Sequence, residues 1–83
     1  MSNWTLYILK CADDTLYTGI TNDLDKRIKD HESGNGAKYT RGRSPLTLVY
    51  KEPHKNRSEA SKREYEVKKL NRPEKEVLIK QGH

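Results

Sequence analysis

The pattern of hydrophobic and polar positions near the N-terminus predicts a β-hairpin. Residues 4–10 and 16–21 are rich in aromatic, β-branched and aliphatic side chains, which is typical of strands. The acidic pair Asp13 and Asp14 lies between them and is a turn signal. We therefore expect an antiparallel pair of strands, with the hairpin centred near Ala12.

A helix, a loop and a third strand are predicted next. Residues 23–32 begin with a capping carboxylate and carry apolar side chains at helical spacing, which predicts a helix. Residues 33–44 are glycine-rich and basic, so a loop is expected there. Residues 46–50 are expected to form a strand that Pro45 opens and Pro53 closes.

Two further helices complete the predicted order. The first is expected to start from a cap at Asn56 or Ser58 and to run to about Leu70. The second is expected to begin at Pro73 with its apolar face inward, where the sequence offers Val77 and Leu78.

The predicted fold class is α+β, with a three-stranded antiparallel sheet flanked by helices in the order β-β-α-β-α-α. All 83 residues are expected to form one domain, residues 1–83. Hydrophobic residues make up only 31% of the chain and charged residues 35%. A core this thin excludes a large enclosed cofactor pocket but leaves room for a surface cleft.

Charge favours a polyanionic partner. The chain carries 17 basic and 12 acidic side chains, a net charge of +5. Residues 1–35 hold four basic and six acidic side chains, whereas residues 36–83 hold thirteen and six. Nucleic acid is the partner that this asymmetry favours first, and a merely solvated surface is the alternative.

Several other classes of protein are disfavoured. Cys11 is the only cysteine and cannot form an internal disulfide, and no Cys/His cluster has zinc-finger spacing. No apolar run approaches the roughly 18 residues of a membrane span, so no membrane association is expected. A cytoplasmic location is the simplest expectation.

Two tyrosines of the hairpin are candidates for chemistry. Tyr7 and Tyr17 are an even number of residues apart, and the expected register places them opposite each other on one sheet face. Gly19 lies on the same face and is expected to leave a gap beside the two phenols. The alternative is a pair of core tyrosines with a packing glycine.

Two helices add three further candidates. Arg27 and His31 are spaced i,i+4 and project from one side of the first helix, where they can bind phosphate and carry a proton. The alternative is a solvated arginine and a rim histidine. Glu64 falls within an apolar stripe of the second helix, where a carboxylate must be paired or bind a metal. Its simplest alternative is a salt bridge to Arg27 or a neighbouring lysine.

Taken in order, these residues resemble the GIY-YIG nuclease domain. The motif pieces are Leu6-Tyr7 and Tyr17-Thr18-Gly19, followed by Arg27, His31 and Glu64. More narrowly, nearly all of the chain is similar to the small stand-alone bacterial GIY-YIG proteins of uncharacterised function. Two motifs depart from the family pattern, because Thr5-Leu6-Tyr7 stands in place of Gly-Ile-Tyr and Thr18 replaces an aliphatic residue.

The resemblance implies phosphodiester hydrolysis with one divalent metal, magnesium or manganese. Glu64 would be the only protein ligand of the metal. Tyr7 would take the proton of the attacking water with the help of Tyr17. Arg27 would hold the scissile phosphate, and His31 would support phosphate binding or proton transfer.

The leading hypothesis is therefore a metal-dependent endonuclease-like domain acting on nucleic acid, with DNA expected rather than RNA. The alternatives are a non-catalytic nucleic-acid-binding module with the same fold and a protein–protein adaptor. Most enzymes of this family carry a second domain, so a partner protein or a homodimer would supply substrate selection. The predicted nucleic-acid contacts are Gly19, Lys38, Tyr39, Arg41 and Arg43, four of them in the basic loop.

Overall fold

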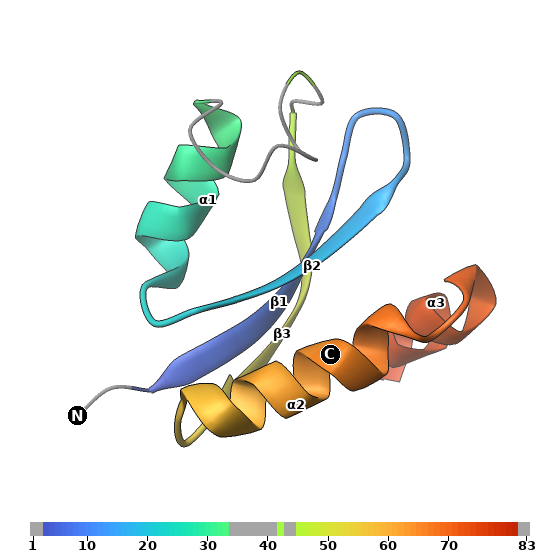
Figure 1. Ribbon diagram of the computed structural model, residues 1–83. Helices are drawn as coiled ribbons and strands as arrows, with labels where there is room; N and C mark the ends of the chain where they lie inside the picture. Colours follow the sequence, from blue (N-terminus) through green and yellow to red (C-terminus); the bar gives the residue numbers. More distant parts are fainter. Residues whose placement is uncertain (1–2, 34–41, 43–44, 82–83) are drawn as a thin grey trace.

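The computed structural model describes residues 3–33, 42 and 45–81. Three strands form one antiparallel sheet in the order β2-β1-β3. The central strand β1 (Trp4–Lys10) pairs with β2 (Leu16–Thr21) on one side and with β3 (Thr47–His54) on the other. The predicted α+β class and element order are confirmed (Figure 1).

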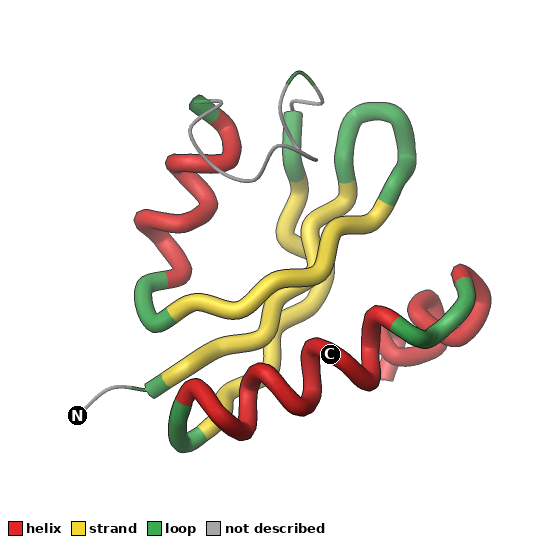
Figure 2. The backbone as a smooth tube through the Cα atoms, viewed as in Figure 1, coloured by secondary structure: helices red, strands yellow, loops and turns green. Residues whose placement is uncertain are grey.

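Helices cover both faces of the sheet (Figure 2). Helix α1 (Leu24–Glu32) packs on the face that carries Tyr7 and Leu9. Helices α2 (Arg57–Lys68) and α3 (Arg72–Gln81) lie on the opposite side. There Leu6 and Ile8 of β1 pack with Tyr50 of β3 and Val67 of α2. Because successive side chains of a strand point to opposite faces, β1 contributes to both clusters, which explains why four consecutive residues, Leu6 to Leu9, are fully buried.

The hairpin register differs from the predicted one by two residues. Tyr7 lies opposite Gly19, and Leu9 lies opposite Tyr17. The expected centre at Ala12 assumed a tighter turn than the five residues that connect Lys10 to Leu16. Asp13 stabilises this loop by accepting hydrogen bonds from the backbone and hydroxyl of Thr15, at 3.2 and 2.6 Å. The shift is even, so both tyrosines stay on the same face.

The third strand is longer than predicted. It continues through Pro53 to His54, so the expected end of the strand at Pro53 was wrong. Proline is tolerated there because β3 is an edge strand, on which a missing N–H can face away from the sheet.

Side-chain caps define the starts of the last two helices. The Asn56 side chain accepts a hydrogen bond from the Glu59 backbone N–H at 2.9 Å, so Asn56 rather than Ser58 caps α2. At α3, Asn71 and Glu74 accept reciprocal hydrogen bonds from each other's backbone N–H groups. This helix then places Leu78 against the core as expected, but Val77 is 53% exposed, and the expectation that it faces inward was wrong. Ile79 takes the second inward position instead.

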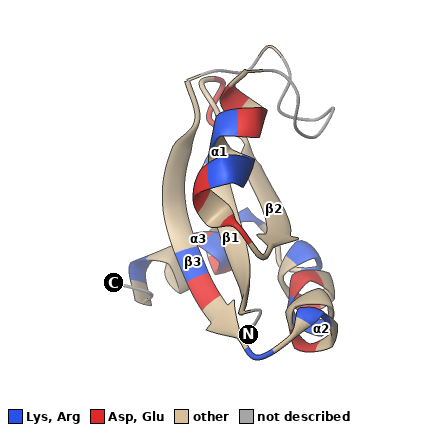
Figure 3. Ribbon diagram, turned by 90° about the vertical axis from the view of Figure 1, so that its left-hand side faces the viewer, with Lys and Arg blue, Asp and Glu red and all other residues tan. Residues whose placement is uncertain are grey.

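Helix α2 runs beside β2 at one edge of the sheet, as the side view shows (Figure 3). A side chain on the flank of α2 nearest this edge can therefore approach the face of the sheet that α1 covers. No helix in the described part of the chain is long and apolar enough to cross a membrane.

Candidate functional site

A buried hydrogen bond joins the centre of the sheet to the end of α1. The Tyr7 hydroxyl lies 2.9 Å from Nε2 of His31, and both side chains are fully buried. Burial raises the pKa of Tyr7 above its ordinary value and outweighs the opposing hydrogen bond from Arg27. Burial, together with the positive charge of Arg27, lowers the pKa of His31. At neutral pH the phenol is therefore protonated and the imidazole neutral, and we assign the Tyr7 O–H as donor to Nε2.

Tyr17 completes a cluster of three rings. Its ring centroid lies 5.1 Å from that of His31 and 6.3 Å from that of Tyr7, and Tyr7 and His31 are 5.9 Å apart. The two contacts that His31 makes are edge-to-face, a favourable arrangement of aromatic rings. Tyr17 is only partly buried, so it is the more accessible of the two phenols.

Gly19 accommodates the Tyr7 ring. A Cβ atom built on Gly19 would lie 2.6 Å from the Tyr7 hydroxyl oxygen and 2.8 Å from Cζ of the same ring. The open gap that was expected beside the phenols is therefore filled by the Tyr7 side chain. Because real Cβ atoms do not approach other atoms this closely, the glycine is required for the position of Tyr7.

Arg27 adds a positive charge to the cluster. It lies one helical turn before His31 on α1 and is half-buried. A hydrogen bond with the Tyr7 hydroxyl is the largest influence on its pKa, which is raised, and Tyr17 contributes further. The guanidinium thus lies within interaction range of both phenols, and the phenol of Tyr7, whose pKa is raised, carries no charge at neutral pH that would neutralise it. It is therefore suited to an anion.

Glu64 reaches the same region from α2. Its side chain is 24% exposed, and its carboxylate forms an ion pair with Nζ of Lys68 at 3.2 Å. The neighbouring-lysine salt bridge foreseen for Glu64 is thus present. The Glu64 charge is also the smallest of the influences that shift the pKa of Tyr7, so the carboxylate lies within electrostatic range of the phenol. Tyr7, Tyr17, Arg27 and His31 thus form one cluster from three elements, and Glu64 of α2 lies within electrostatic range of its Tyr7.

The donor set determines which metal this site can hold. In the described part of the chain, no group of three or more His, Cys, Asp or Glu side chains is placed to bind a metal. One carboxylate is nevertheless enough for Mg²⁺, which keeps several of its waters and prefers oxygen ligands. Glu64 offers such oxygens at a partly exposed position, and its partner Lys68 is 54% exposed and long enough to move aside. The residues present therefore fit a hydrated divalent ion that a substrate phosphate helps to hold.

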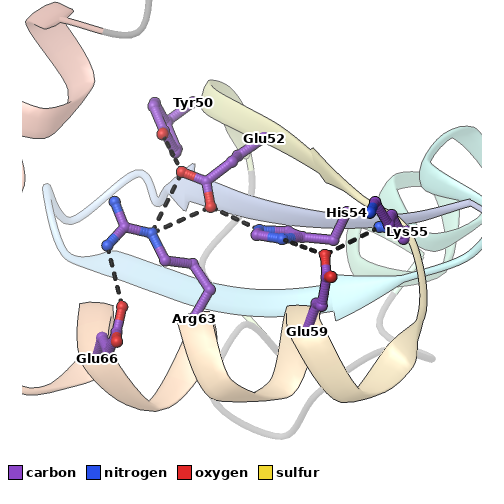
Figure 4. A network of polar contacts seen from close by, with 7 residues as sticks. All are labelled: Tyr50, Glu52, His54, Lys55, Glu59, Arg63 and Glu66. Atoms are coloured by element: carbon purple, nitrogen blue, oxygen red, sulfur yellow. Dashed lines mark hydrogen bonds and ion pairs between the residues drawn. The ribbon is translucent and has the colours of Figure 1, made fainter.

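A second polar network, which the sequence did not single out, holds α2 in place. Glu52 of β3 accepts hydrogen bonds from the Tyr50 hydroxyl at 2.5 Å and from Nε of Arg63 at 3.1 Å, and it contacts Nε2 of His54 at 2.6 Å (Figure 4). Burial alone would raise the pKa of Glu52, but these hydrogen bonds and the charge of Arg63 lower it. Since Arg63 directly precedes Glu64, the contacts of Arg63 with Glu52 and Glu66 also fix the position of Glu64 around the axis of α2. The alternation of polar residues along β3 was the available signal.

The basic loop and Thr18 were also singled out in the sequence. Lys38, Tyr39, Arg41 and Arg43 lie outside the described residues. Thr18, which stands where the family pattern has an aliphatic residue, is buried, and its hydroxyl has no hydrogen-bond partner within the described structure. Its surroundings are thus those of an apolar side chain.

The titration of His31 predicts how stability depends on pH. Its pKa is below 6.5 in the folded protein, so the unfolded chain binds more protons between these two values. The contribution of neutral His31 to the free energy of unfolding is complete above pH 6.5. It is lost as the pH falls toward the pKa of the folded state, by up to about 1.4 kcal/mol per pH unit. Urea titrations from pH 7.5 to 5 should therefore show a steeper loss of stability for the wild type than for His31→Gln. Equal slopes would contradict the lowered pKa of His31, because the two proteins contain the same other titrating groups.

Comparison with known proteins agrees with this fold. The family model of the GIY-YIG catalytic domain matches residues 3–77, and the chain belongs to this family. Its fold is thus of the nuclease type. A UPF0213 protein of Clostridium perfringens is 61% identical over 74 residues, covering 89% of this chain and 80% of the relative. The UPF0213 protein YhbQ of Escherichia coli is 48% identical over 82 residues, covering 99% and 82%.

Two solved structures are also similar. The solution NMR structure of a UPF0213 protein from Bacillus halodurans matches with a TM-score of 0.63 and 52% identity, over 95% of this chain and 84% of that one. The solution NMR structure of a protein from E. faecalis matches with a TM-score of 0.68 and 38% identity, over 98% and 86%.

Proposed function

We propose that the protein hydrolyses phosphodiester bonds of nucleic acid, with DNA as the preferred substrate, and that it needs one divalent metal ion, Mg²⁺ or Mn²⁺. The observation that carries this proposal is the buried Tyr7–His31 hydrogen bond, with Arg27 and the Glu64 carboxylate within electrostatic range of Tyr7, in a chain of the GIY-YIG family. A hydrated metal on Glu64, when bound, would stabilise negative charge on the phosphate during the reaction.

Arg27 is proposed to bind the phosphate. Its planar guanidinium can donate two parallel hydrogen bonds to phosphate oxygens, and the phenol contacts hold it in position. Because it is half-buried, its charge is screened less than that of a surface arginine. Charge that develops on the phosphate would therefore be stabilised by a group that is already oriented.

Proton transfer is proposed to run through Tyr7 to His31. A phenol with a raised pKa is a poor base by itself, but the neutral Nε2 of His31 can accept the Tyr7 proton across their hydrogen bond. As that proton leaves, the Tyr7 oxygen can take the proton of the attacking water. Tyr17, which is more exposed and in contact with His31, is the residue through which solvent approaches this pair.

A cleavage assay tests the proposal. Purified protein is incubated with single-stranded, duplex and branched DNA and with matched RNA, each with Mg²⁺, with Mn²⁺ or with EDTA. We expect cleavage with metal, none with EDTA, and faster cleavage of DNA. Anisotropy measurements in EDTA report binding separately. Binding without cleavage of any substrate would support the non-catalytic module instead, and neither binding nor cleavage would reject both functions.

A further inference from the structure

The outer surface of α2 carries an exposed aromatic ring among lysines. Tyr65 is 64% exposed and belongs to neither hydrophobic cluster of the core. Since successive residues of an α-helix are about 100° apart, Lys62, Lys68 and Lys69 lie around the same outward side of the helix as Tyr65. All three lysines are exposed. We call this set, Lys62, Tyr65, Lys68 and Lys69, the α2 platform.

The acidic side chains of α2 near these lysines have partners of their own. Glu59 and Glu66 border Lys62 on the helix surface, but Glu66 pairs with Arg63 at 3.2 Å and Glu59 lies 3.9 Å from Nδ1 of His54. Figure 4 shows Glu66 at α2 beside Arg63, and Glu59 rising from α2 toward His54. Glu64, one turn before Lys68, forms an ion pair with that lysine, so none of these three carboxylates in the described structure lacks a partner of its own. The platform therefore presents net positive charge.

The ring of Tyr65 is held by a cation. Nζ of Lys69 lies 4.2 Å from the ring centroid, a close cation–π contact. This contact occupies one face of the ring and restricts its orientation. An exposed, oriented aromatic ring with cations around it has the two elements that bind single-stranded nucleic acid, namely stacking on a base and neutralisation of phosphates.

We propose that an unpaired base of single-stranded nucleic acid stacks on Tyr65, while Lys62, Lys68 and Lys69 contact the flanking phosphates. The inference rests on the proposed function, because it gives the nucleic acid a binding surface next to Glu64 in the same helix. Charge complementarity selects this occupant, since three lysines would oppose a second copy of the same basic surface. Stacking does not depend on base identity, so the platform should bind without sequence preference.

The test compares an oligothymidylate with an abasic strand of equal length, each labelled with a fluorophore. Anisotropy is measured in EDTA, which prevents cleavage. Tyr65→Leu should weaken binding of the oligothymidylate at least about fivefold and leave the abasic strand unaffected. Tyr65→Phe, which keeps the ring, should bind like the wild type. Lys69→Gln should weaken both strands and lower the salt slope by about 0.7, whereas Lys80→Gln on α3 serves as the charge control.

The outcomes separate this inference from the proposed function. If the wild type binds or cleaves nucleic acid and Tyr65→Leu binds oligothymidylate equally well, the platform is rejected and the proposed function stands. If the wild type binds neither strand and cleaves no nucleic acid, both the platform and the proposed function are rejected. Equal losses for both strands would reject stacking as well. A concentration-dependent dimer that Tyr65→Leu abolishes, with no change in oligonucleotide affinity, would show that the ring serves self-association instead.

Discussion

Replacing Glu64 with glutamine is expected to lower metal-dependent cleavage by more than about 100-fold. Loss of an outer partner of a metal ligand already reduces affinity or activity by about 10- to 100-fold, and this change removes the charge of the proposed ligand itself. Glutamine has nearly the same volume, and the variant loses only the ion pair between residue 64 and Lys68. Exposed i,i+4 pairs contribute about 0.3–0.5 kcal/mol, so the free energy of unfolding should hardly change.

The matched control is Glu66→Gln, two residues further along the same helix. Glu66 is 64% exposed and pairs with Arg63 on the other flank of α2, so this variant should cleave like the wild type. Binding of Mn²⁺, followed by water-proton relaxation, gives a readout that does not depend on turnover. Full activity in Glu64→Gln would exclude Glu64 as the ligand. Equal losses in both variants would instead indicate a general effect of charge on α2.

Replacing Gly19 with alanine is expected to destabilise the fold by about 1–3 kcal/mol, the usual effect of overpacking. The new Cβ would lie 2.6 Å from the Tyr7 hydroxyl oxygen, and the Tyr7 ring that would have to move is fully buried. Moving the ring would also break its hydrogen bond to His31. The melting temperature should fall by about 4–8 °C for each kcal/mol in a domain of this size.

A double-mutant cycle identifies the cause. In a Tyr7→Leu background the clashing ring is absent, so Gly19→Ala should cost much less there than in the wild type. If the clash did not matter, alanine would stabilise the protein by about 0.4–1 kcal/mol, because it restricts the unfolded chain. A rise in melting temperature for the single variant would therefore contradict the close packing of Gly19 and Tyr7.

The sequence predicted the elements better than their details. Periodicity and capping residues located all six elements, because their signals are local. The hairpin register could not be obtained this way, since the loop contains Asp14 in a left-handed conformation with φ 70° and is longer than a minimal turn. Pro53 was misjudged because the rule against proline applies to inner strands, and the sequence does not say which strand lies at the edge.

The candidate site was predictable for a different reason. Tyr7 and Tyr17 are an even number of residues apart, so a register shift of two residues leaves them on the same face of the sheet. The predicted shared face was therefore correct, although the predicted pairing of the two tyrosines was wrong. The burial of His31 was not predictable, because a histidine at the rim of a helix face and one inside the core have the same spacing. The Glu52 network was missed since its members come from β3 and α2, which only the tertiary structure brings together.

Arg63 and Glu64 are consecutive residues with different surroundings: Arg63 donates to Glu52 of β3, whereas Glu64 pairs with Lys68 and lies within electrostatic range of Tyr7. The helix that carries them begins at its N-cap, Asn56, so the number of residues after Asn56 determines which way each side chain points. Inserting or deleting one residue between the cap and Arg63 would turn the rest of α2 by about 100°, so that both side chains would leave their partners together. Over evolution this segment can thus change by substitution, but a change in its length would remove the ion pair and the proposed ligand in a single step.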